Sequence, residues 1–226
     1  AEQALASLDE VLNIQINHSD DNPAVIVGAS NQYAQFPQVA KYLVEGQGGV
    51  FPTTNFEPLP VALAVQNLSV ALTHVSHNSV MRTIHLSDEH FTKLTRFLSA
   101  PENQGHAFGA IQKAFVDMQV RNKQLATPVS FDGISIAGGI EDTFTNLKLA
   151  SDNLIQIVDN TRVIYGLELL HSTQAIDLRK QANPELQLGK ATQAMYKAYR
   201  EKVPFVAKDR PFTPDIQAST DFITHY

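Results

Sequence analysis

Apolar residues recur at three- and four-residue steps along the segment from Glu141 to about Arg179, which is the spacing of one helix face. From Val163 onward the apolar positions spread around the helix, and such a helix must be covered on most sides. The segment holds no proline, and Gly166 costs only about 1 kcal/mol relative to alanine. A helix of about 40 residues would be roughly 60 Å long. We therefore predict a strut of a large helical bundle, running between subunits.

The same periodicity predicts helices in other parts of the chain, namely residues 2–16, 61–86, 107–124 and 188–202. Ser87 is a candidate N-cap for a further short helix that ends at Leu98. The proline-rich segment 209–216 is predicted to be extended.

The segment between the first two helices has a different pattern. Residues 24–27 form a short apolar run that is typical of a strand. From Gly28 to Pro60 there is little periodicity apart from a candidate turn of helix at residues 39–44, and glycines and prolines interrupt the chain. Loops of this length are usually functional or mobile. The predicted fold class is therefore mainly α, a long-helix bundle with a long irregular loop and at most a small β element.

Composition limits the partners. The formal net charge of -6 argues against nucleic acid, because binding phosphates needs a basic surface. No cysteine occurs, so we expect neither disulfides nor thiolate metal sites, which is compatible with a cytoplasmic location. The longest apolar run, residues 60–65, is far short of a membrane span, so no membrane partner is expected. Ala1 lies inside a helical pattern, and we expect the chain to be part of a longer one.

Glu141 is the most suggestive candidate for chemistry. It follows Gly138-Gly139 at the expected start of the long helix. There the helix dipole favours a carboxylate by about 0.3–1 kcal/mol and would keep it ionised. Simple charge complementation of the helix end, which Asp142 could share, is the competing interpretation. Phe56, in the loop before the second helix, is either a core plug or a pocket wall.

Other polar residues have a structural explanation beside a functional one. His74 and His77 could share a helix face, but no third ligand lies at a clear helical spacing, which argues against a metal site. Glu168 lies in the apolar half of the long helix and needs a partner there. Either it forms a buried ion pair with an arginine from another segment, or it faces a channel.

Several short motifs stand in a fixed order along the chain: Asp21-Asn22-Pro23, Asn55-Phe56, Glu141-Asp142, Gln174-Ala175-Ile176-Asp177-Leu178-Arg179 and Val203-Pro204-Phe205. In this order and spacing they resemble the C-terminal half of the aromatic amino acid ammonia-lyase family. The Glu-Asp pair is closest to its histidine ammonia-lyase members. The resemblance covers nearly the whole chain.

The resemblance implies a fold and an activity. It implies a mostly helical homotetramer of the ammonia-lyase/fumarase-like type, with residues 1–226 as the C-terminal portion of the domain. The family eliminates ammonia from an aromatic amino acid without oxidation. Its electrophile, a methylidene-imidazolone, forms from an Ala-Ser-Gly tripeptide, and its active sites combine residues of more than one subunit.

The resemblance also implies roles for three residues. Glu141 corresponds to the carboxylate that faces the side chain or amine of the substrate. Phe56 corresponds to the aromatic wall near the electrophile, and Asn55 beside it would contact the substrate.

This sequence departs from the family pattern at specific positions. No Ala-Ser-Gly occurs, so the electrophile is expected in a missing N-terminal half. Ile140 and Glu57 stand where the family has glutamine and histidine, and the family's Ser-Glu-Arg-Arg keeps only its ends in residues 79–82.

Two hypotheses follow from the motifs and the departures. In the first, the chain is the C-terminal part of an ammonia-lyase-like enzyme, inactive alone, that pairs with the missing half or with further copies. In the second, it is a lyase-derived, non-catalytic helical assembly or ligand-binding protein.

Overall fold

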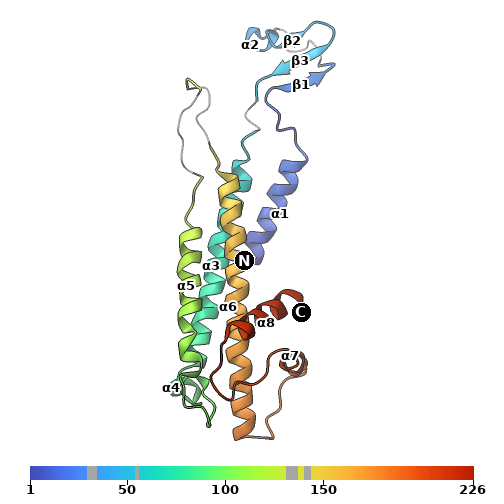
Figure 1. Ribbon diagram of the computed structural model, residues 1–226. Helices are drawn as coiled ribbons and strands as arrows, with labels where there is room; N and C mark the ends of the chain where they lie inside the picture. Colours follow the sequence, from blue (N-terminus) through green and yellow to red (C-terminus); the bar gives the residue numbers. More distant parts are fainter. Residues whose placement is uncertain (30–34, 54–55, 131–136, 140–143) are drawn as a thin grey trace. The chain divides into compact units, whose positions relative to one another are not determined.

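Helices account for most of the chain in the computed structural model, which describes residues 1–29, 35–53, 56–130, 137–139 and 144–226 (Figure 1). The helices are α1 (Glu2–Ile16), α2 (Pro37–Ala40), α3 (Leu59–Leu86), α4 (Glu89–Thr92), α5 (Gln112–Leu125), α6 (Leu147–Ala182), α7 (Lys190–Arg200) and α8 (Thr213–His225). Short 3₁₀ turns span Arg96–Leu98 and Ala107–Ala110. The strands are β1 (Ala24–Val27), β2 (Leu43–Val44) and β3 (Gly48–Phe51).

The chain divides into two compact units. One contains Ala1, Ser69–Thr127 and Asn153–Tyr226, and the other contains Glu2–Leu68 and Pro128–Asp152. Helices α3 and α6 are each divided between the two units, with one part of each helix in each unit.

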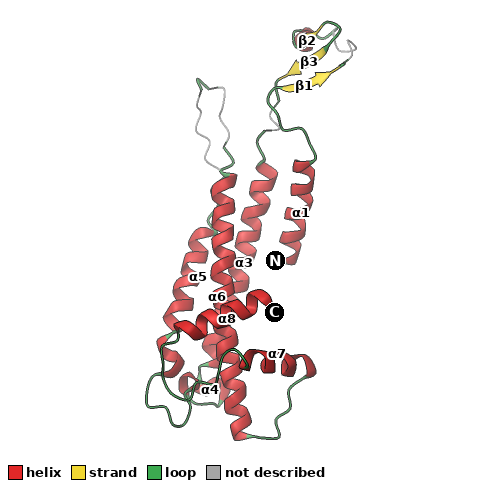
Figure 2. Ribbon diagram, turned by 45° about the vertical axis from the view of Figure 1, so that its right-hand side comes forward, coloured by secondary structure: helices red, strands yellow, loops and turns green. Residues whose placement is uncertain are grey.

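In the first unit, α5 lies beside the parts of α3 and α6 that belong to it, and both views show this packing (Figures 1 and 2). A smaller apolar cluster includes Val80 of α3, Phe115 of α5, and Ile164 and Leu167 of α6. A larger one gathers apolar side chains of α6, α7 and the connecting turns, among them Leu98, Phe108, Leu170, Tyr199 and Val203. Helix α6 therefore forms the centre of this unit, as its wide apolar surface predicts.

A seam of buried polar side chains runs between the same three helices. The Ser76 hydroxyl of α3 donates to Oε1 of Gln119 at 2.6 Å, and the amide of Gln119 donates back to the Thr73 carbonyl at 3.1 Å. Asn122 of α5 donates to the Thr161 hydroxyl of α6 at 3.4 Å. Buried polar groups need partners, so these contacts favour one register between the helices.

Helix α3 is also the one helix in the described part of the chain that is long and apolar enough to cross a membrane. Long core helices of water-soluble bundles meet the same criterion, and half of the relevant stretch is buried here. The hydroxyls of Thr73 and Ser76 on its buried side bond to neighbouring groups in this unit. This pattern is that of a core helix.

The chain end differs from the prediction. Residues 209–216 were expected to be extended, but α8 begins at Thr213. Pro214 lies in its first turn, where proline is tolerated because the missing N–H needs no helical partner. Asp215, in the same turn, accepts from Nε of Arg210 at 2.8 Å and from Nη2 at 3.1 Å. The prediction failed because it treated proline only as a helix breaker.

Gly166 lies where α8 crosses α6 (Figure 2). A Cβ atom at this position would come within 2.9 Å of the backbone nitrogen of Thr220 and 3.1 Å of the carbonyl carbon of Ser219. Both contacts are with backbone, which cannot rotate away. The one glycine of the long helix is therefore required by the close approach of α8.

Two other helix boundaries differ from the prediction. Ser87 was expected to cap a helix that ends at Leu98, but Asp88 is the N-cap of α4 and accepts from the backbone N–H of His90 at 2.8 Å. Ser87 is buried and donates to the Thr83 carbonyl at 3.2 Å instead. Helix α4 ends at Thr92, and the predicted helix 107–124 starts as a 3₁₀ turn before α5.

The second unit carries the β element. Strand β3 lies at the centre of a three-stranded antiparallel sheet of order β1-β3-β2, with Val25 opposite Val50 and Leu43 opposite Gly49. The strand at residues 24–27 is confirmed. In residues 28–60 the sequence marked only a turn of helix at residues 39–44, whereas the structure has α2 at Pro37–Ala40 and the strands β2 and β3. Strands this short leave little periodicity to detect.

His171 is fully buried on α6 between the rings of Phe108 and Phe115, with ring centroids 4.6 and 5.9 Å away. Its Nδ1 lies 2.7 Å from the Leu167 carbonyl, so it carries the proton and donates. Nε2 has no partner. Burial lowers the pKa of His171 to about 4, and the imidazole is neutral in the folded protein at pH 7.

We expect Gly166→Ala to lower the free energy of unfolding by about 1–3 kcal/mol, because the new methyl group overpacks the crossing with α8. Helix propensity alone predicts the opposite sign, a gain of about 1 kcal/mol. Urea denaturation would measure the change, with Gln156→Ala on the exposed side of α6 as the control. A stabilised Gly166→Ala protein would contradict the close approach.

We expect His171 to make stability depend on pH. Its pKa is lower in the folded than in the unfolded chain, so stability is complete above pH 6.5 and is lost as the pH falls toward 4. The full loss amounts to roughly 3 kcal/mol. In urea denaturation, the free energy of unfolding of His171→Leu should therefore depend less on pH than that of the unaltered chain. His90→Gln, at an exposed position, serves as the control and should show the pH dependence of the unaltered chain. If the free energy of unfolding varied with pH in the same way in His171→Leu and in the unaltered chain, this prediction would be wrong.

Candidate functional site

Of the three residues predicted to form a site, one lies in the described part of the chain. Phe56 lies in a turn just before α3, and its side chain is 42% exposed. This exposure excludes the core-plug interpretation within this chain and leaves an aromatic face available to a ligand or another segment. Asn55 and Glu141 lie outside the described residues.

The long helix starts later than predicted. Helix α6 begins at Leu147, and residues 144–146 are not helical. Glu141 lies outside the described residues, so the stabilisation of its carboxylate by a helix dipole stays a prediction. Asn146, with φ of 48°, precedes the helix, and its carbonyl accepts from the N–H of Ala150 at 3.0 Å. Asparagine tolerates this left-handed conformation better than most residues.

Asn146 also joins the two sides of the segment that carries Glu141. Its side-chain amide donates to the Val129 carbonyl at 2.7 Å. The described residues before and after this segment are thus held together at its base. We call residues 128–130 and 144–146 the stem.

Gln66 of α3 ties the stem to that helix. It is 7% exposed, and its Oε1 accepts from the backbone N–H of Val129 at 2.6 Å. Its Nε2 lies 2.7 Å from the Ser130 hydroxyl and 3.0 Å from the Ala62 carbonyl, and donates to both. Phe56 and the stem therefore both adjoin the N-terminal part of α3 within one unit.

Sequence reasoning missed Gln66 and Asn146. A signal for Gln66 was present, because it is a polar residue between the apolar positions Val65 and Leu68 of a buried helix and so needs partners. No local pattern marks Asn146, since its partner Val129 is far away in the sequence.

Glu168 of α6 pairs with an arginine of α3, as expected, but the expected burial of the pair was wrong, because the Arg82 side chain is 54% exposed. Its carboxylate accepts from Nε of Arg82 at 2.5 Å, from Nη2 at 2.8 Å and from the Ser79 hydroxyl at 2.5 Å. These hydrogen bonds raise the pKa of Arg82. Ser79 and Arg82 are the two residues of the 79–82 motif that match the family pattern. They and Glu168 form a clamp between the helices.

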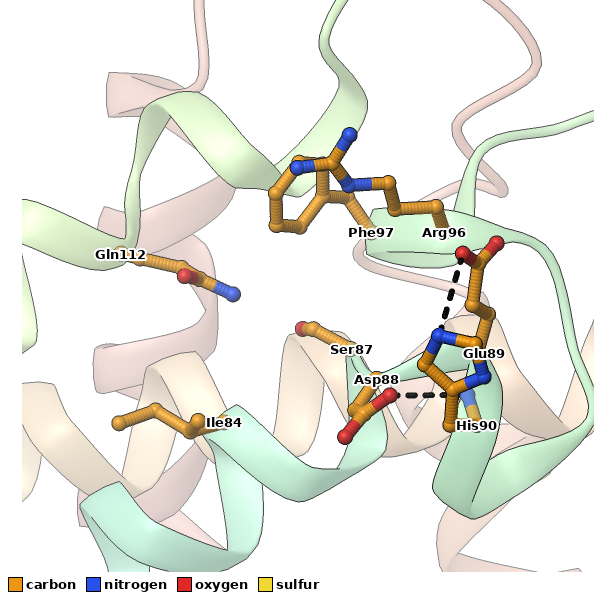
Figure 3. A pocket seen from close by; sticks show the side chains of 8 residues that line it. All are labelled: Ile84, Ser87, Asp88, Glu89, His90, Arg96, Phe97 and Gln112. Atoms are coloured by element: carbon orange, nitrogen blue, oxygen red, sulfur yellow. Dashed lines mark hydrogen bonds and ion pairs between the residues drawn. The ribbon is translucent and has the colours of Figure 1, made fainter.

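A polar hollow of about 340 Å³ lies at the end of α3, lined by Ile84, Ser87, Asp88, Glu89, His90, Arg96, Phe97 and Gln112 (Figure 3). The guanidinium of Arg96 stacks over the Phe97 ring at 4.7 Å. Asp88 caps α4, and Glu89 lies 3.9 Å from the His90 ring. Within the described ranges, no group of three histidine or acidic residues could hold a metal ion, here or near His74.

A family model described as aromatic amino acid lyase matches residues 1–201. The chain belongs to the aromatic amino acid lyase family. Among its curated relatives, it is 31% identical to the histidine ammonia-lyase of Vibrio cholerae over 95% of this chain and 38% of the relative. That of Shewanella woodyi is 30% identical over the same shares. The resemblance drawn from the motifs is confirmed.

Solved structures of the lyase family share the fold. The ergothioneine-degrading enzyme ergothionase of Treponema denticola, in complex with desmethyl-ergothioneine sulfonic acid, is 36% identical with a TM-score of 0.80, over 99% of this chain and 40% of that one. The histidine ammonia-lyase of Trypanosoma cruzi is 23% identical with a TM-score of 0.82, over 98% of this chain and 40% of that one. The mainly α fold is thus confirmed, and the chain spans about two-fifths of these relatives.

We expect the clamp between Glu168 and Arg82 to contribute about 1 kcal/mol of coupling, because Arg82 is 54% exposed and water screens the pair. A double-mutant cycle with Glu168→Gln and Arg82→Met, followed by urea denaturation, would measure it. Arg121 and Asp117, both exposed, offer a matched surface pair whose coupling should be smaller. Coupling no larger than that of the surface pair would contradict the clamp.

Proposed function

We propose that the chain is the C-terminal part of a histidine or aromatic amino acid ammonia-lyase, which eliminates ammonia without oxidation. The observation that carries this proposal is the family match over residues 1–201. In the proposal the chain supplies substrate-pocket residues and part of a tetrameric helical core. The N-terminal half supplies the electrophile.

This chain cannot make the electrophile, because it contains no Ala-Ser-Gly. When present, a methylidene-imidazolone withdraws electrons from the substrate and makes the amine a better leaving group. The exposed ring of Phe56 fits the role of a wall beside such a planar group. The carboxylate of Glu141 would hold the imidazole or ammonium group of the substrate through a charge-assisted hydrogen bond, with Asn55 as a further polar contact.

The substrate has two candidates. Histidine is supported by the curated relatives, at about 30% identity. Ergothioneine is supported by the 36% identity to ergothionase, which extends over 99% of this chain. Both compounds carry an imidazole-derived ring, so a carboxylate at Glu141 suits either. Histidine would lose ammonia, whereas ergothioneine carries a trimethylammonium group and would lose trimethylamine.

Exposed apolar side chains support assembly with other subunits. Leu5 and Ile16 of α1, Leu63 of α3 and Ile155 of α6 are each more than half exposed. Apolar exposure on several helices of one chain is typical of surfaces covered in an assembly. This supports the tetramer in the proposal. It equally supports the alternative, a non-catalytic assembly, which the altered positions Ile140, Val80 and Met81 favour.

The test is to purify the natural product, determine its intact mass, and record imidazolone absorbance and amine release from histidine, phenylalanine, tyrosine and ergothioneine. We expect a mass well above 24.9 kDa, imidazolone absorbance and activity, and we expect the isolated 226-residue chain to be inactive. Activity of the isolated chain would contradict this division of roles. Lack of both absorbance and activity in the natural product would favour the non-catalytic alternative.

In the active protein, Glu141→Gln should lower kcat/KM by about 100-fold, because it removes the charge that holds the substrate. Phe56→Ala should lower it by about tenfold through lost packing. Glu185→Gln, at an exposed position after α6, should leave it unchanged. Equal effects of Glu141→Gln and Glu185→Gln would exclude Glu141 from the site.

A further inference from the structure

We propose that the polar hollow at the end of α3 is a binding site for a small α-amino acid with an apolar side chain. All residues that line it lie between Ile84 and Gln112, within one compact unit. Its volume of about 340 Å³ lies at the lower end of the range of small-molecule sites, which is about 300–1,000 Å³. The inference goes beyond the proposed function and does not depend on it.

The first support is a cation that has no partner within the chain. The guanidinium of Arg96 stacks over the ring of Phe97, 4.7 Å from the ring centroid. Among the described residues, this side chain forms no ion pair and no hydrogen bond. Stacking covers one face of the guanidinium and leaves its N–H groups open, and these match the two oxygen atoms of a carboxylate. Figure 3 shows Arg96 at the upper edge of the hollow.

The second support is the backbone that holds this stack. Phe97 and Leu98 have φ angles of 53° and 55°, and a left-handed conformation costs of order 1–3 kcal/mol for a residue other than glycine. Two features hold the turn: Leu98 is fully buried, and the Phe97 N–H donates to the Ser87 carbonyl at 3.0 Å. The ring of Phe97 is also so close to Gly109 that a Cβ atom there would come within 2.7 Å of it. Strained residues held in this way gather at ligand sites.

The third support is a set of acceptors on the opposite side of the hollow, formed by Asp88, Glu89 and the buried Ser87 (Figure 3). Oδ1 of Asp88 accepts from the backbone N–H of His90 at 2.8 Å, which leaves Oδ2 to a ligand. The Ser87 hydroxyl donates to the Thr83 carbonyl at 3.2 Å and keeps its own lone pairs. An ammonium group has three donors and needs acceptors of this kind.

The combination of charges selects the ligand. A simple anion would be attracted by Arg96 but repelled by Asp88 and Glu89. A simple amine would be attracted by the two carboxylates but repelled by the guanidinium. An α-amino acid carries a carboxylate and an ammonium group on one carbon atom, so it meets both sides of the hollow with the complementary charge.

The remaining lining residues suit the rest of such a ligand. The amide of Gln112 points into the hollow and has no hydrogen-bond partner in the part of the chain that the structure describes, so it can donate to the ligand carboxylate (Figure 3). Ile84 and the ring of Phe97 provide apolar surface for a side chain. The competing explanation is that these charges are only solvated by water and that the hollow is a gap between turns.

The first experiment is hydrogen–deuterium exchange of the purified natural protein with L-leucine. Two probes share its carbon skeleton: 4-methylpentanoate lacks the amine, and 3-methylbutylamine lacks the carboxylate. L-Leucine should slow exchange in segments 84–98 and 108–112 by about threefold or more, because bound ligand stabilises the folded state around it. At equal concentration the two analogues should not. Unchanged exchange of these segments with L-leucine would overturn the proposal.

The second experiment measures the Kd for L-leucine by equilibrium dialysis. Arg96→Met should raise it by about tenfold or more, because a charge-assisted hydrogen bond is lost while methionine still packs on Phe97. Asp88→Asn should raise it by about fivefold or more, because the charge is lost while asparagine still caps α4. Arg121→Met, which removes an exposed arginine already paired with Asp117, is the control and should leave Kd unchanged.

Two results of the dialysis would overturn the proposal. Equal Kd values for Arg96→Met and Arg121→Met would show that the guanidinium does not hold the ligand. Binding of 4-methylpentanoate as tight as that of L-leucine would show that the ammonium group is not recognised. Neither experiment measures amine release, so the outcome is separate from that of the proposed function.

Discussion

The need to satisfy polar groups inside a helical bundle governs this structure. The long helices α3 and α6 carry polar residues on buried faces, and each such residue would destabilise the fold without a partner. Glu168 meets this need with Arg82 and Ser79, and Gln119 meets it with Ser76. Apolar packing favours burial in general, whereas these directional contacts allow only one alignment of the helices. The same requirement, at Gln66, extends the order of the helices to the stem.

The helices could be predicted where apolar periodicity extends over many turns. The segments 2–16 and 61–86 were predicted within two residues of α1 and α3, because burial of one face sets their pattern. Prediction failed where single residues decide the structure. Asn146, in a left-handed conformation, precedes α6, which starts later than predicted, and Pro214 lies in the first turn of α8. These are local backbone effects, which cannot be predicted from the spacing of apolar residues.

The candidate site could be predicted only in part. Phe56 and Glu141 were identified through their resemblance to family motifs, and of these two only Phe56 lies in the described part of the chain. The contact between Gln66 of α3 and Val129 of the stem joins residues far apart in the chain. A single sequence records that a buried glutamine needs a partner but not which one. The pairing of Glu168 with an arginine was predictable from burial, whereas the choice of Arg82 was not.

Strand β1 exposes apolar side chains at a sheet edge, which affects how the isolated chain behaves in solution. It lies at the edge of the sheet, and Val25, Ile26 and Val27 are 68%, 51% and 87% exposed. In the described part of the chain, β3 is the only strand that pairs with it. A short, uncharged edge of branched side chains is a template on which another copy can add a strand. Aggregation of the isolated chain would therefore begin at this sheet edge even while its helices remain folded.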